Sequence, residues 1–460
     1  MDSLIRFRKS VMSILKLLTI ISVVCTFIGC WQIYYEESLF SSKGNYVVVL
    51  SYLIIFVAFT SIYGGFKVGV LRLHEIIYSS CLSLVFTNFI IYLELSLVAR
   101  QMLNPVNMII LTACQFLIIA VSDYSQNSVY FALYSAKHIL AIYCNDCQSR
   151  DIIKKMQHVK ERYSIDKGIS ADHTTGEIKA EIDKFQAVLI CDFEKSKKDE
   201  LLKYCYATRK RIYLLPSTND IITNNSYQSQ IFDTPILICR NRGLSMEQRV
   251  IKRFMDIVLS SVAILVSSPI MLVVSIAIKM CDKGPILFKQ NRVTINGRIF
   301  NVYKFRSMIV DADSEGAKKA TTRDSRITPI GKIIRPLRID ELPQFFNVLL
   351  GSMSIVGPRP ERTENVHEYT QQHNEFDLRH RVKGGITGYA QIYGKYNTSP
   401  IDKLNMDLIY IENYSFLNDI KLMVMTIKIL FVRESSEGFS EEANADIKKT
   451  SKKQAETPKQ

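Results

Sequence analysis

Four apolar runs occupy the first quarter of the chain, and each is about 16 to 18 residues long with almost no charge. A helix of this length approaches the roughly 30 Å thickness of the hydrocarbon layer of a membrane. We therefore predict four transmembrane helices, at residues 17–34, 46–62, 76–92 and 106–121. No cluster of charges inside these runs marks a transport pathway, so anchoring is their default role.

Lysine and arginine are distributed unevenly around the four runs. Basic residues precede the first run, lie between the second and third, and follow the fourth, whereas the other two connecting segments carry few. Because basic segments stay in the cytoplasm, we predict that the N-terminus and everything after residue 122 lie there. A cleaved signal peptide is disfavoured, since no small-x-small site follows the first run and three more apolar runs do.

Residues 136–243 show short β-rich runs that alternate with charged helical periodicity. This alternation predicts a small Rossmann-like α/β domain with a parallel sheet. The predicted strands are 138–143, 187–192 and 211–216, and the predicted helices are 150–159 and 198–209. A dinucleotide site requires a glycine-rich turn after the first strand, but Cys144 to Cys147 stand there, so we predict no dinucleotide bound in the usual way. With no second Cys or His pair nearby, a structural role is favoured for these cysteines over zinc or redox chemistry.

A fifth apolar run, residues 254–280, has basic residues on both sides, so both of its ends favour the cytoplasmic face. Ser267, Ser268 and Pro269 interrupt it, and a proline removes a backbone donor and breaks or kinks a helix. Each arm spans about one leaflet, at roughly 14 to 17 Å of helix. We predict a re-entrant helical hairpin whose freed carbonyls bond to Ser267 and Ser268. A kinked full span is the alternative.

The charges divide the chain in the same way as the apolar runs. It contains 58 Lys and Arg and 44 Asp and Glu, but only 14 of these lie in the first 125 residues. This distribution excludes a wholly soluble protein and equally a pure bundle of membrane helices. A net charge of +14 beside membrane spans indicates anionic lipid or phosphate-bearing substrates rather than nucleic acid. The ten scattered cysteines indicate reduced, packed thiols.

Asp340 and Glu341 are adjacent, flanked by arginines and followed by a proline. Mg²⁺ takes one or two carboxylates and completes its shell with phosphate oxygens and water, while guanidinium groups bind phosphate bidentately. Arg359 lies between two prolines that fix its backbone. An Asp-Glu pair alone is more often a solvated helix end, but the nearby arginines favour a site for a cation and a phosphate.

The segment from about residue 252 to 431 resembles the bacterial sugar transferase family, the monotopic phosphoglycosyl transferases. The matching strings are KRFMDIVLSS, GPILFKQNRV, YKFRSM, DSRITPIGKIIR, RIDELPQFFNVLLGSMSIVGPRPE and GITGYAQ. With the four helices and the α/β domain ahead of it, the whole chain resembles the large members of that family. The Ser268-Pro269 break in a re-entrant hairpin is also a feature of the family. The implied fold is a four-helix transmembrane bundle, a Rossmann-like α/β domain, and an α/β monotopic catalytic domain at residues 248–434.

The resemblance implies transfer of a sugar 1-phosphate from a UDP-sugar to undecaprenyl phosphate, with release of UMP. This reaction primes exopolysaccharide, capsule or O-antigen synthesis at the cytoplasmic face of the bacterial plasma membrane. In it Asp340 is the nucleophile, and Glu341 and Asp340 hold Mg²⁺. Implied phosphate- or substrate-binding residues are Arg359, Lys304, Arg306, Arg335, Gln344, Thr387, Gly388 and Gln391.

Two departures from the family pattern leave the donor sugar open, with glucose and galactose favoured. Gly384 and Gly385 replace a common Pro-Gly, and Arg338 and Ile339 replace a common Ser-Leu. Two other functions stay open: a membrane glycosyltransferase that releases UDP, and a non-catalytic regulator that senses a nucleotide. A homodimer is compatible with the sequence.

Two further segments carry no predicted chemistry. Three histidines at positions 367, 373 and 380 fall in a polar stretch and are predicted to be solvated surface. The polar tail 435–460 is predicted to be disordered.

Overall fold

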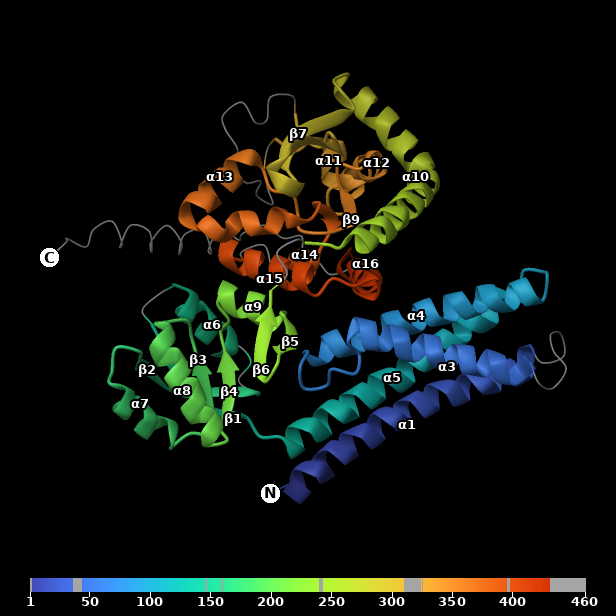
Figure 1. Ribbon diagram of the computed structural model, residues 1–460. Coiled ribbons are helices and arrows are strands. Elements are labelled where there is room, and N and C mark those ends of the chain that lie inside the picture. The colour runs from blue at the N-terminus through green and yellow to red at the C-terminus, as the bar shows by residue number, and fades with distance from the viewer. Residues whose placement is uncertain are drawn as a thin grey trace. The chain divides into compact units, whose positions relative to one another are not determined.

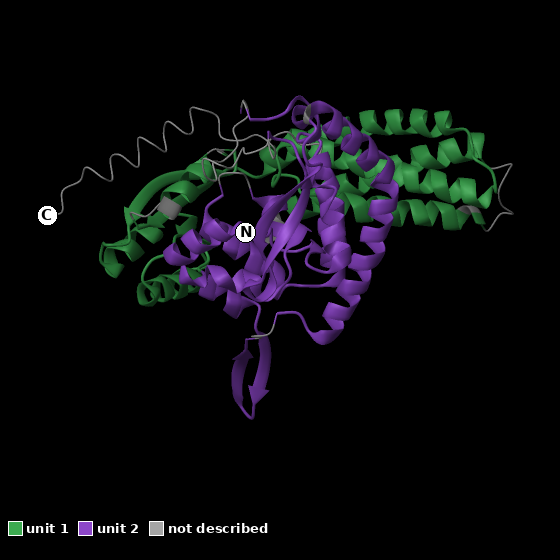
Figure 2. Ribbon diagram, turned by 90° about the horizontal axis from the view of Figure 1, so that it is seen from above, with its two compact units in different colours: residues 1–217 green, residues 218–460 purple. Residues whose placement is uncertain are grey.

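The computed structural model describes residues 2–35, 44–144, 147–157, 159, 161–239, 243–309, 324, 326–394 and 398–430. The chain divides into two compact units, residues 1–217 and 218–460 (Figure 2). The predicted disordered tail, 435–460, lies outside the described residues, as does part of the loop from Cys144 to Cys147.

Unit 1 begins with four long helices: α1 (Asp2–Tyr34), α3 (Gly44–Tyr63), α4 (Leu73–Val98) and α5 (Pro105–Leu133). All four are long and apolar enough to cross a membrane, and all extend beyond the apolar runs that predicted them. They lie side by side (Figure 1) around a shared core in which Phe27 stacks on Tyr52 with ring centroids 4.0 Å apart. Long apolar helices at the N-terminus are thus confirmed.

The rest of unit 1 is an α/β domain. Its strands are β1 (Lys137–Tyr143), β2 (Tyr163–Ser170), β3 (Ala187–Ile190) and β4 (Arg211–Leu214), with helices α6 (Cys147–Gln157), α7 (Thr175–Ile182) and α8 (Lys195–Ala207) between them. Every pairing is parallel, in the order β2-β1-β3-β4. All four residues of β3 are buried, as expected for a strand covered on both faces. The predicted parallel α/β domain is therefore confirmed.

Unit 2 begins with α9 (Thr218–Asn224) and an antiparallel hairpin, β5 (Tyr227–Ile231) and β6 (Thr234–Ile238). Ile221 of α9 lies in the main core of this unit, because α9 packs against α15 (Pro400–Glu412). The next element is α10 (Met246–Asp282), a helix of 37 residues capped by the hydroxyl of Ser245.

The predicted break at Pro269 lies inside α10, whose ribbon bends along its length (Figure 1). Pro269 has no N–H for the carbonyl of Leu265, four residues earlier, and the hydroxyl of Ser268 donates to that oxygen at 2.7 Å. The hydroxyl of Ser267 donates to Ala263 O at 2.6 Å. The predicted compensation is confirmed for Ser268, whereas Ala263 O is the ordinary acceptor of the N–H of Ser267 and is not freed by Pro269. The two predicted arms form one continuous helix.

Buried hydrogen bonds and an ion pair hold the first turns of α10 against the core of unit 2. Asp256 accepts hydrogen bonds from Ser354 Oγ at 3.0 Å and from the N–H of Ile355 at 2.9 Å. Lys252 pairs with the buried Asp419 at 2.5 Å. Beyond these turns, side chains such as Leu265, which is 75% exposed, have no protein covering them. Farther along the helix, Met271, Val274 and Ile278 are buried in a small core, so one face of α10 packs on unit 2 while the other exposes apolar side chains. An exposed apolar face of this kind is typical of a helix that contacts a membrane.

The remaining elements of unit 2 carry the polar motifs. They are β7 (Leu287–Val293), η1 (Ile295–Gly297), β8 (Ile299–Phe305), α11 (Pro329–Ile334), η2 (Ile339–Glu341), α12 (Gln344–Leu350), β9 (Ser354–Val356), α13 (Thr363–Gln372), η3 (Asn374–Arg381), β10 (Gly385–Thr387), α14 (Tyr389–Tyr393), α15 and α16 (Phe416–Leu430). Strands β7 and β8 form an antiparallel pair, and β9 and β10 form a short parallel pair.

Candidate active site

Asp340 and Glu341 lie on the single 3₁₀ turn η2, between α11 and α12. Arg338 enters this turn in the left-handed region, with φ of 53°, which is uncommon for a residue other than glycine. Pro343 follows and caps the next helix, α12. The strained entry and the proline hold two adjacent carboxylates in a fixed turn.

Glu341 is held by basic side chains from three segments. Lys304 Nζ, from β8, lies 2.8 Å from Glu341 Oε1, and Arg359 Nη2, from the loop after β9, lies 3.2 Å from the same oxygen. Arg338 approaches the second oxygen at 3.9 Å. Burial alone raises the pKa of Glu341, but these cations outweigh it and hold that pKa well below its usual range. Glu341 is therefore ionised at neutral pH.

The environment of Asp340 shifts its pKa in the opposite direction from that of Glu341. Burial, followed by the charge of neighbouring Glu341, raises its pKa to about 6, against the opposing influence of Lys304 and Arg335. Within the described part of the chain, no side chain forms a hydrogen bond or an ion pair with its carboxylate. The turn therefore presents one carboxylate that is bound by cations and one that is desolvated and has no described side-chain partner.

A second layer of charges fixes the backbone around Arg359. Arg379, only 2% exposed, donates from Nη2 to Arg359 O at 2.9 Å and pairs with Asp407 at 2.7 Å. Arg292 donates to Pro360 O at 2.9 Å. Two guanidinium groups thus bind consecutive carbonyls, which orients the side chain of Arg359 toward Glu341.

Arg292 and Arg379 were not among the predicted site residues. Arg379 falls in the polar stretch whose histidines were predicted to be solvated, and that prediction is wrong for His380. Its side chain is buried, and burial lowers its pKa to about 4. No local pattern reveals these contacts, because the partners of Arg379 lie 18 to 28 residues away in sequence. His367 is exposed as predicted, and His373 is intermediate.

The predicted substrate-binding residues fall into two groups around the turn. Lys304 and Arg359 contact Glu341, and Arg335 is close enough to lower the pKa of Asp340. Thr387 and Gly388 lie beside the loop that carries Arg359, since the N–H of Gly357 donates to Thr387 O at 2.8 Å.

The other predicted residues have no described contact with either carboxylate. Arg306 is buried against the backbone of Gly284. Gln344 is buried at the start of α12, and Gln391 lies in α14 with both of its amide atoms buried.

The two carboxylates are also the predicted ligands of a magnesium ion. The described residues contain no group of three His, Cys, Asp or Glu side chains able to enclose a cation. Mg²⁺ commonly binds one or two carboxylates and takes its other ligands from phosphates and water. The carboxylate of Asp340 and the second oxygen of Glu341, which Arg338 approaches at 3.9 Å, fit that mode.

Known proteins match this part of the chain. A family described as Bacterial sugar transferase matches residues 247–433. A sugar transferase of uncharacterised function from Bacillus subtilis, EpsL, is 37% identical over 185 residues, which cover 40% of this chain and 89% of the relative. The segment with the carboxylate turn and the long α10 is thus a sugar transferase unit. The chain belongs to the bacterial sugar transferase family.

Other relatives have more specific names. The UDP-glucose:undecaprenyl-phosphate glucose-1-phosphate transferase of Klebsiella pneumoniae is 39% identical over 225 residues, which cover 47% of this chain and 48% of that protein. The UDP-N-acetylgalactosamine-undecaprenyl-phosphate N-acetylgalactosaminephosphotransferase of Aeromonas hydrophila is 44% identical over 183 residues, covering 39% and 43%. The chain therefore aligns with about half the length of these two relatives.

Proposed function

We propose that this protein is a phosphoglycosyl transferase that moves a sugar 1-phosphate from a UDP-sugar to undecaprenyl phosphate. The products are UMP and a polyprenyl diphosphate sugar, and the reaction primes exopolysaccharide, capsule or O-antigen synthesis. The observation that carries the proposal is the turn in which cations neutralise Glu341 while the neighbouring Asp340 is desolvated and has no described side-chain partner. The names of the relatives, which specify UDP-sugars and undecaprenyl phosphate, support the two substrates.

In the proposed mechanism, a carboxylate oxygen of Asp340 attacks the phosphorus that bears the sugar. The bond between this phosphorus and the bridging oxygen breaks, and that oxygen leaves with UMP. An oxygen of the lipid phosphate then attacks the aspartyl-phosphosugar and releases Asp340 unchanged. Covalent catalysis of this kind divides one difficult displacement into two easier steps.

The cations around Glu341 supply the electrostatic part of the mechanism. Lys304 and Arg359 lie beside the carboxylate pair, where they stabilise the negative charge of a diphosphate. Lys304 and Arg335 oppose the effect of burial on the pKa of Asp340 and favour its ionised form. Mg²⁺, held by Asp340 and Glu341, would neutralise charge between the two phosphoryl groups.

The membrane arrangement is part of the proposal. Helices α1, α3, α4 and α5 cross the bacterial plasma membrane, and α10 enters the cytoplasmic leaflet and returns, so that the catalytic unit stays in the cytoplasm. The lengths and apolar composition of these helices support this arrangement, as do the basic residues on both sides of α10. The catalytic segment corresponds to residues 248–434, with glucose and galactose as the first candidate sugars.

Measurement of the released nucleotide tests the reaction. With the full chain in detergent or nanodiscs, a UDP-sugar, undecaprenyl phosphate and Mg²⁺, we expect UMP in amounts equal to the lipid-linked product. UDP would instead identify a glycosyltransferase that moves the sugar alone. No turnover with a panel of UDP-sugars would favour the non-catalytic regulator.

A further inference from the structure

A buried carboxylate lies inside the helical core of unit 1. The fourth apolar run was predicted to end at residue 121, but α5 continues to Leu133 and brings Asp123 into the helix packing. Its side chain is only 3% exposed, and its Oδ2 has no hydrogen-bond partner among the described residues. An unneutralised carboxylate in such surroundings is strongly unfavourable, and an ionisable residue inside a membrane segment indicates a function.

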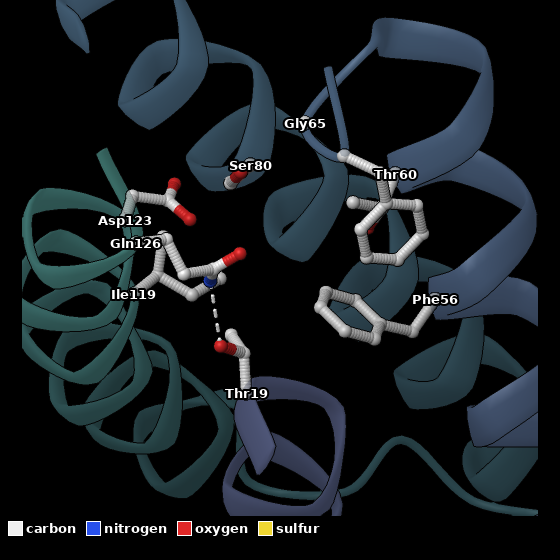
Figure 3. Close-up of a pocket in the computed structure, with 9 residues that line it drawn as sticks. Thr19, Phe56, Thr60, Gly65, Ser80, Ile119, Asp123 and Gln126 are labelled. Atoms are coloured by element: carbon white, nitrogen blue, oxygen red, sulfur yellow. Dashed lines mark hydrogen bonds between the residues drawn. The ribbon is translucent and has the colours of Figure 1, made fainter. Parts of the chain in front are cut away.

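Asp123 faces a small cavity at which the four long apolar helices α1, α3, α4 and α5 meet. Figure 3 shows its carboxylate beside Ser80 of α4, with the amide oxygen of Gln126 pointing into the same space and Thr60 of α3 across from it. Gln126 Nε2 donates to Thr19 Oγ1, from α1, at 2.9 Å. The amide of Gln126 is thereby oriented with its oxygen toward the cavity.

The cavity has oxygen ligands but no positive side chain. Lysine, arginine and histidine are absent from its described lining. The hydroxyl of Thr60, 3% exposed, has no hydrogen-bond partner within the described residues, so a second buried oxygen besides Asp123 Oδ2 is left unsatisfied. Two unsatisfied buried oxygens at one cavity indicate a missing partner.

The size and charge of the cavity define that partner. The cavity has a volume of about 10 Å³, which is room for a single particle the size of a water molecule. One carboxylate with neutral hydroxyl and amide oxygens balances one positive charge. Mg²⁺ keeps several of its waters and Ca²⁺ takes six to eight oxygens, so neither divalent ion fits.

We propose that this cavity binds one dehydrated sodium ion, with Asp123, Thr60, Ser80 and Gln126 as its oxygen ligands. The ion neutralises Asp123 and ties α3, α4 and α5 together, and α1 is joined through the bond from Gln126 to Thr19. This site is independent of the proposed transferase reaction, since none of its residues belongs to the carboxylate turn.

Binding of ²²Na⁺ to the full chain in nanodiscs tests the site. We expect saturable binding of one ion per chain, which a large excess of choline does not displace. Asp123→Asn, which keeps the shape and removes the charge, should abolish binding. Glu94→Gln is the matched control, because Glu94 is a carboxylate of α4 that accepts hydrogen bonds from Ser51 and does not line this cavity. This variant should bind sodium as the unsubstituted chain does.

Thr60→Val serves as the second variant, in case Asp123→Asn does not fold. Losing one ligand at constant shape should raise the Kd for sodium about tenfold. Sodium at about ten times its Kd should also raise the Tm by roughly 3 °C at constant ionic strength. Absence of saturable binding, an unchanged Kd in Thr60→Val, or full binding by Asp123→Asn would overturn the proposal and assign the cavity to a water beside a protonated carboxyl group.

Discussion

The two carboxylates of the 3₁₀ turn are adjacent in sequence but differ in protonation. Lys304 and Arg359 keep Glu341 ionised, whereas burial and the charge of Glu341 raise the pKa of Asp340 to about 6. Carboxylates whose surroundings separate their pKa values commonly take different roles in catalysis. Asp340 is suited to react, and Glu341 to hold cations.

The raised pKa of Asp340 predicts the pH dependence of the reaction. A nucleophilic carboxylate must be ionised, so kcat/KM should fall below pH 6, to about a tenth of its plateau at pH 5. Lys304→Met should move this acidic limb to higher pH, because the ammonium group favours ionised Asp340. The check is a profile of UMP release from pH 4.5 to 8. A flat profile between pH 5 and 7 would contradict the role of Asp340.

Replacing Asp340 should abolish the activity without lowering the stability of the fold. Asp340→Asn removes the nucleophile and should reduce UMP release by a factor on the order of 1000 or more. The folded pKa lies above the unfolded value, so the carboxyl group stabilises the fold when protonated at low pH, and this stabilisation is lost as the pH rises through about 6. At pH 7 the neutral amide should therefore leave the Tm unchanged or raise it.

Asp324 provides the matched control for this stability effect. Arg326 binds both of its oxygens, at 2.9 and 2.7 Å, and these hydrogen bonds lower the pKa of Asp324 to about 2. Its contribution to stability is present above the unfolded pKa and lost as the pH falls through about 2. Asp324→Asn should therefore lower the Tm at pH 7. A fall in Tm for Asp340→Asn of the same size would refute the assignment.

At the scale of the elements, two short strands bring the loop of Arg359 against the loop after β10. The close approach requires glycine at position 388, where an added Cβ would lie 2.1 Å from Gly357 O. Since Gly357 leads directly into Pro358 and Arg359, a displacement there moves the cation that contacts Glu341.

Gly388→Ala should therefore reduce kcat/KM by about 10- to 100-fold, because small displacements of catalytic groups have effects of that size. It should also destabilise the fold by about 1–3 kcal/mol through overpacking. Gly176→Ala in α7 is the control, since its Cβ would meet nothing within 4 Å. Normal activity in Gly388→Ala would mean that this contact does not position Arg359.

The elements also show what the sequence could and could not predict. Strands β1, β3 and β4 were predicted because their apolar residues form continuous runs. Strand β2 was missed, since its exposed charged residues, Asp166 and Lys167, interrupt the apolar run. The carboxylate pair and Arg359 were found from local motifs, whereas Arg379 and Arg292 act through contacts distant in sequence. Local patterns do not reveal such pairings.

For the whole molecule, the decisive question is the path of α10. It has polar anchors at its start and exposed apolar side chains along one face, and a full span would place its two ends on opposite sides of the membrane. Basic residues flank α10 at both of its ends. They favour a path in which both ends stay on the cytoplasmic face, because transfer of lysine or arginine across the bilayer is unfavourable. Two native cysteines, Cys239 before this helix and Cys281 in its last turn, are both exposed and provide ready probes.

We expect both cysteines to react from the cytoplasmic side alone. Each is kept singly in an otherwise cysteine-free chain that still releases UMP, and a membrane-impermeant maleimide is added to right-side-out and to inverted vesicles. Labelling of both positions only in inverted vesicles would agree with a re-entrant α10, since its two ends then share the cytoplasmic face. Pro269→Ala, which restores the N–H for Leu265 O, removes the local reason for the bend and should shift Cys281 toward labelling from outside. Labelling of Cys239 and Cys281 from opposite sides in the unsubstituted helix would establish a full span and exclude the re-entrant path.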